Sequence, residues 1–118
     1  MIRIFPPMVW KDDLMECEAV PLISYFRSAD LAGPDYLRFW FDREDGDDVW
    51  LYFQISIPDL VAFKSQRLTS LQVWQNAPQI IREFTDKNGV HLSYEWITLD
   101  DIPANVRPST DSFLYPDL

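Results

Sequence analysis

The most concentrated reactive groups in this chain are five carboxylates within the seven residues 42–48. Carboxylate oxygens bind calcium, and an EF-hand loop needs them at fixed offsets, with glycine at position six and glutamate at position twelve. Counting back from Gly46 places Phe41 at position one, so the segment does not follow that pattern. We interpret it as a solvated turn whose like charges discourage aggregation, and we expect neither a metal site nor a cofactor. The carboxylates belong to Asp42, Glu44, Asp45, Asp47 and Asp48.

The other reactive side chains are one cysteine and one histidine, Cys17 and His91. A single cysteine forms neither an internal disulfide nor a multi-cysteine zinc site. Cys17 alternates in step with the apolar Met15 and Ala19 and has no adjacent basic group, which favours a buried structural thiol over a nucleophile. His91 stands beside a turn and would need distant carboxylates to complete a metal site. Because the sequence also lacks a phosphate-binding glycine loop, HExxH and a dinucleotide fingerprint, we predict no catalytic residue.

The net charge of −9 limits the classes of partner. Such a surface repels nucleic-acid phosphates and anionic membranes, so we expect neither as a direct partner. It suits a basic protein partner, because complementary charge speeds the encounter. The predicted contact site combines exposed rings as anchors with a rim of carboxylates. Its rings are Trp40, Trp50 and Tyr52, and its rim is Asp42, Glu44, Asp45, Asp47 and Asp48.

Two strand-like runs, 36–41 and 49–55, would position these rings on either side of the acidic turn. Both runs are rich in aromatic and β-branched residues and alternate with a period of two, which predicts a β-hairpin closed at Gly46. One face is purely apolar and is assigned to the core. The opposite face carries the mixed rings, and it either lies under other parts of the chain or forms an exposed binding patch.

The remaining segments predict an α+β fold. Runs 79–85 and 90–97 flank Asn88-Gly89, the strongest short hairpin signal, and predict a second hairpin. Short helices are expected at 58–66 and 70–75, where Ser56 can cap the first and Thr69 with Gln72 forms a capping box. The prolines at 6, 7 and 21 restrict the N-terminal third to an extended segment and an edge or bent strand.

We therefore expect a twisted antiparallel sheet of about five strands in two hairpins, with the two helices inserted between them. Residues 1–98 would form a single domain, followed by an irregular acidic tail at 99–118. No apolar run reaches the roughly 18 residues of a membrane span, and the first residues lack a signal-peptide core. These observations predict a cytoplasmic location.

Segments 21–78 carry a family resemblance. The succession PLISYF, YLRFWFD, the acidic turn, DVWLYFQIS and TSLQVWQNAP resembles an uncharacterised family of small bacterial domains. The resemblance implies a fold and a bacterial or phage origin. It implies no activity and no site residue.

Four functions are consistent with the sequence. The first is a non-enzymatic protein-binding module, such as a small acidic antitoxin, immunity protein or accessory subunit. A nucleic-acid mimic would need its acids in a ribbon as regular as a phosphate backbone. An enzyme or small-ligand binder would need a concave pocket with convergent polar groups. A structural subunit or homodimer is the fourth.

Overall fold

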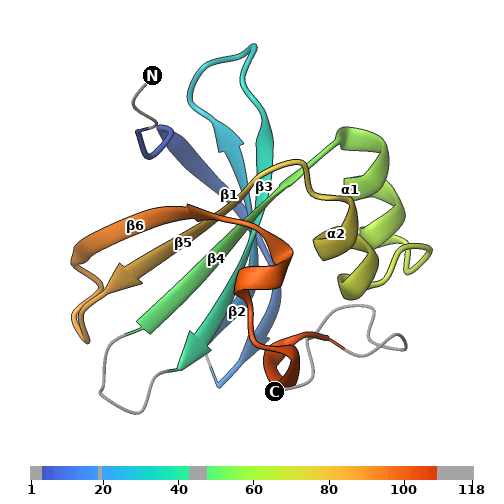
Figure 1. Ribbon diagram of the computed structural model, residues 1–118. Coiled ribbons are helices and arrows are strands. Elements are labelled where there is room, and N and C mark those ends of the chain that lie inside the picture. The colour runs from blue at the N-terminus through green and yellow to red at the C-terminus, as the bar shows by residue number, and fades with distance from the viewer. Residues whose placement is uncertain (1–3, 19, 43–47, 109–118) are drawn as a thin grey trace.

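The computed structural model describes residues 4–18, 20–42 and 48–108. Its six strands form one antiparallel sheet in the order of the sequence (Figure 1). The strands are β1 (Met8–Cys17), β2 (Val20–Ser28), β3 (Asp35–Asp42), β4 (Asp48–Ile55), β5 (Ile80–Thr85) and β6 (His91–Ile97). Helices α1 (Ile57–Lys64) and α2 (Ser70–Asn76) lie between β4 and β5, and 3-10 turns η1 (Leu99–Asp101) and η2 (Ala104–Val106) follow β6. None of the described helices is long and apolar enough to cross a membrane.

The α+β class and the antiparallel sheet are confirmed, but the expected count of about five strands in two hairpins is wrong. The N-terminal third forms a third hairpin, β1–β2, in which Glu16 pairs with Pro21 and Cys17 with Val20. Its register shifts three times, between Trp10 and Asp12 and at two further points before Glu16. Each such bulge interrupts the alternation of side chains, so a period of two does not identify this strand.

The central hairpin has the predicted position. Asp35 pairs with Ile55 at one end of β3–β4, and Asp42 pairs with Asp48 at the turn. Its apolar face is buried, as expected, apart from the half-buried Val49, and Phe39 and Phe53 are at 0% exposure. The second hairpin is also confirmed, and its turn places Gly89 at a φ of +80°, a conformation that glycine adopts without steric cost.

The two helices cover this apolar face, α1 with Leu60 and Phe63 and α2 mainly with Trp74. The Trp74 ring stacks on Phe53 with centroids 4.5 Å apart and meets Phe39 edge-on at 5.5 Å. Both predicted caps form: the Asp59 amide donates to Ser56 Oγ at 3.3 Å, and Thr69 with Gln72 forms the capping box. The first helix ends at Lys64, earlier than expected.

The segment after β6 is anchored on the sheet as far as residue 108. Ile102 is 2% exposed and belongs to the core beneath the helices. The guanidinium of Arg107 donates hydrogen bonds to the carbonyls of Leu99 and Ile102, at 2.9 and 3.1 Å. These bonds close the two 3-10 turns against one another within the described part of the predicted tail.

Candidate functional site

The structure places the predicted aromatic anchors on one face of β3–β4, where Trp40 pairs with Trp50 and Arg38 with Tyr52. Trp40 and Trp50 are half-buried, but Tyr52 is only 4% exposed, so the expectation of an exposed ring is wrong for Tyr52. Of the predicted acidic rim, Asp48 is half-buried. Glu44, Asp45, Asp47 and the side chain of Asp42 lie outside the described part of the chain.

Other aromatic residues cover Tyr52. The Phe5 ring, in the segment before β1, meets Tyr52 edge-on at 5.3 Å and Tyr94 at 5.5 Å. Phe26 of β2 meets Tyr52 from another side at 5.8 Å. Together with Tyr36 and other ring residues they form a second, smaller core on this face. Most of the mixed face is therefore packing between strands and the N-terminal segment.

The half-buried guanidinium of Arg38 lies within this second core. Its Cζ lies 3.9 Å from the Trp50 ring centroid and 4.5 Å from that of Phe26, which are cation–π distances. Within the described residues, its Nε has no hydrogen-bond partner. The indole of Trp50 is fixed in turn by donating to Thr85 Oγ1 at 2.8 Å. This face thus carries a fixed positive charge between rings.

The buried carboxylate of Glu83, which the sequence analysis did not single out, connects β5 with both neighbouring strands, β4 and β6. Glu83 of β5 accepts a hydrogen bond from the Tyr52 hydroxyl at 2.8 Å on one oxygen. Its other oxygen lies 2.6 Å from His91 Nδ1. The only sequence signal was its alternation with Ile81 and Thr85, which puts three side chains of one predicted strand on one face. Because the carboxylate is shielded, the network orients rings and does not present a free base.

Burial raises the pKa of the Tyr52 phenol well above its ordinary value, although the nearby Arg38 cation partly offsets this effect. The folded protein therefore favours the protonated phenol. The protonated phenol of Tyr52 thus stabilises the folded protein. This stabilisation is fully present at pH values below the unfolded pKa of about 10 and is lost as the pH rises toward the folded pKa.

We expect the melting temperature to fall steeply above about pH 10. In Tyr52→Phe that alkaline decline should be shallower, and an identical slope in the two proteins would contradict this assignment.

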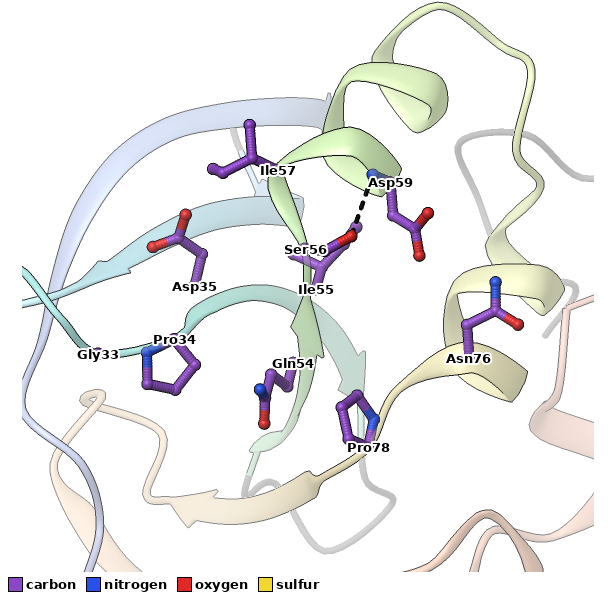
Figure 2. Close-up of a pocket in the computed structure, with 10 residues that line it drawn as sticks. All are labelled: Gly33, Pro34, Asp35, Gln54, Ile55, Ser56, Ile57, Asp59, Asn76 and Pro78. Atoms are coloured by element: carbon purple, nitrogen blue, oxygen red, sulfur yellow. Dashed lines mark hydrogen bonds between the residues drawn. The ribbon is translucent and has the colours of Figure 1, made fainter.

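A separate pocket opens where the β2–β3 loop meets the end of β4 and both helices (Figure 2). Its volume is about 400 Å³. Pro34 and Asp35 lie on one side, and Asp59 and Asn76 lie on the other (Figure 2). The loop can pass this close to β2 only because residue 33 is glycine: a Cβ there would lie 2.1 Å from Ser28 Oγ.

The two carboxylates of this pocket have different environments. Asp35 has a side chain 12% exposed, accepts a hydrogen bond from the Tyr25 hydroxyl at 3.0 Å and has Arg27 at 4.0 Å. Asp59 is half-buried, and no described residue donates to its carboxylate or pairs with it. Two polar amides, Gln54 and Asn76, complete the lining beside apolar side chains. No motif predicts this pocket, because it is assembled from three separate stretches of the chain, within 33–35, 54–59 and 76–78.

The expectation of a buried Cys17 is wrong, since this side chain is exposed. Cys17 ends β1, directly before Glu18, whose φ of +50° starts the tight turn to β2. Among the described residues, no three His, Cys, Asp or Glu side chains are grouped closely enough to hold a metal ion.

Comparisons of the chain with protein-family models, with curated proteins and with solved structures find no match.

Proposed function

We propose that this protein is a non-enzymatic binding module that docks on a basic partner protein. The observation that carries the proposal is the presence of well-exposed large apolar side chains on a chain with a net charge of −9. Leu31 is 95% exposed, Trp10 53% and Ile57 52%. Apolar anchors within a charged rim are the usual composition of a protein–protein contact surface.

An enzymatic role has less support. Cys17 ends β1 and His91 begins β6, and these strands are the two opposite edges of the sheet. Five strand spacings of about 4.8 Å separate them by roughly 24 Å, too far for a thiolate–imidazole pair. In the part of the chain that the structure describes, the imidazole of His91 contacts the carboxylate of Glu83, and this carboxylate also accepts a hydrogen bond from the Tyr52 hydroxyl.

The proposal is tested by affinity capture followed by kinetics. The immobilised full chain is exposed to a lysate of its source cells, and bound proteins are identified by mass spectrometry. Each candidate is then purified and its association rate is measured at increasing salt. We expect a basic partner whose association rate falls about tenfold or more from low to high salt, because the charges steer the encounter. Capture of no partner, or an association rate indifferent to salt, would count against the proposal.

A further inference from the structure

We infer that the pocket between the β2–β3 loop and the helices receives a long basic side chain, arginine or lysine, from the partner. This inference rests on the proposed function and names the contact surface within it. The pocket lies within the range of about 300–1,000 Å³ that ligand sites occupy. It combines two carboxylates with apolar walls, and a basic side chain combines a charged head with an apolar stem.

Asp59 is the acceptor for the charged head. No described residue pairs with its carboxylate, whereas Asp35 across the pocket is already engaged by Tyr25 and Arg27. Asp35 therefore adds a negative charge that Arg27 partly offsets, and the amide oxygens of Gln54 and Asn76 are further acceptors. A guanidinium, with five donors in a plane, fits acceptors distributed around a pocket better than a single point charge does.

Exposed apolar side chains lie beside the pocket and would seat the residues that flank the basic side chain. Ile57 lines the pocket, and Val61 follows it four residues later on the same face of α1, with 52% and 50% exposure. Leu31 projects from the β2–β3 loop with 95% exposure. It is held there by a turn in which Gly33 donates to the Asp30 carbonyl at 2.9 Å and Ala32 to Asp30 Oδ1 at 3.1 Å. The rim is thus formed before binding, which lowers the entropy cost of association.

The test uses the full chain, labelled with ¹⁵N, and the peptides acetyl-Leu-Arg-Leu-amide and acetyl-Leu-citrulline-Leu-amide. Citrulline has nearly the shape of arginine but no charge. We expect the arginine peptide to shift the side-chain amide signals of Gln54 and Asn76 and the backbone signal of Gly33. The citrulline peptide should bind at least about tenfold more weakly, as measured by the peptide concentration needed to shift these signals, because it lacks the charge-assisted hydrogen bond.

Two variants, each lacking one negative charge, distinguish binding in this pocket from a general effect of the net charge. Asp59→Asn should weaken the arginine peptide about tenfold. Glu18→Gln removes the same charge from an exposed side chain at the opposite end of β2, and should leave the affinity unchanged. Retained signal dispersion establishes that each variant is folded.

The inference would be overturned if the two peptides bound with equal affinity. It would also be overturned if Asp59→Asn and Glu18→Gln lost equal affinity for the arginine peptide. A captured basic partner that binds Asp59→Asn as tightly as the unaltered protein would likewise overturn it, and the proposed function would then stand without this pocket. Failure to capture a salt-sensitive basic partner would instead overturn the proposed function.

Discussion

Replacing Trp74 with alanine should lower the free energy of unfolding by about 3–5 kcal/mol. Trp74 is 1% exposed and stacks on Phe53 while it meets Phe39 and Phe41 edge-on. Alanine would leave a cavity between α2 and the sheet, and each lost aromatic contact adds about 0.5–1.5 kcal/mol to the loss of buried area. The measurement is urea unfolding followed by circular dichroism, with the stability taken at constant m-value.

Trp74→Phe is the matched control. The Trp74 Nε1 is buried and has no hydrogen-bond partner within the described residues, so phenylalanine would forfeit no bond there. It would keep a stacked ring, and we expect a loss of about 1–2 kcal/mol. Equal losses in the two variants would contradict the role given to the stacked ring. Because Asn76 is the last residue of α2, the alanine variant should also disturb the pocket that includes Asn76.

The parts of the fold that the sequence predicts well are those set by local chemistry. The strands on either side of Gly89 are joined by a turn in which that glycine has a positive φ, and their register shifts only once, between Phe84 and Thr85. Both helices begin at caps that depend on residues three positions apart. The β1–β2 hairpin escapes such reasoning, because its three register shifts break the alternation that identifies a strand.

The candidate sites depend on contacts between distant segments, which local patterns do not encode. The Tyr52 ring of β4 is covered by Phe5, which lies before the first strand, and by Phe26 of β2. The pocket needs Pro34, Asp59 and Asn76 to meet, and their meeting follows from strand register and helix packing together. Sequence alternation placed Tyr52 on the correct face but gave no information on what covers it.

The second large effect should come from Glu83→Ala, which we expect to lower the free energy of unfolding by about 2–3 kcal/mol. The variant leaves the buried Tyr52 hydroxyl without its acceptor and removes the partner of His91. An unsatisfied buried donor costs its full desolvation, whereas an exposed one is satisfied by water. The control is Glu95→Ala on the neighbouring strand. Its side chain is 47% exposed and pairs with Arg82, so its loss should cost less than about 1 kcal/mol.

A double-mutant cycle tests whether the cost of Glu83→Ala arises at Tyr52. Tyr52→Phe alone should cost about 1 kcal/mol, because it removes one hydrogen bond to a carboxylate that keeps His91 as a partner. In the double variant no buried hydroxyl is left unpaired, so the combined loss should be smaller than the sum of the two single losses by about 1 kcal/mol or more. Strict additivity would mean that Tyr52 finds another acceptor when Glu83 is absent. The stability of this face would then come from the packing of Phe5, Phe26 and Tyr94 around the Tyr52 ring, and not from the buried carboxylate.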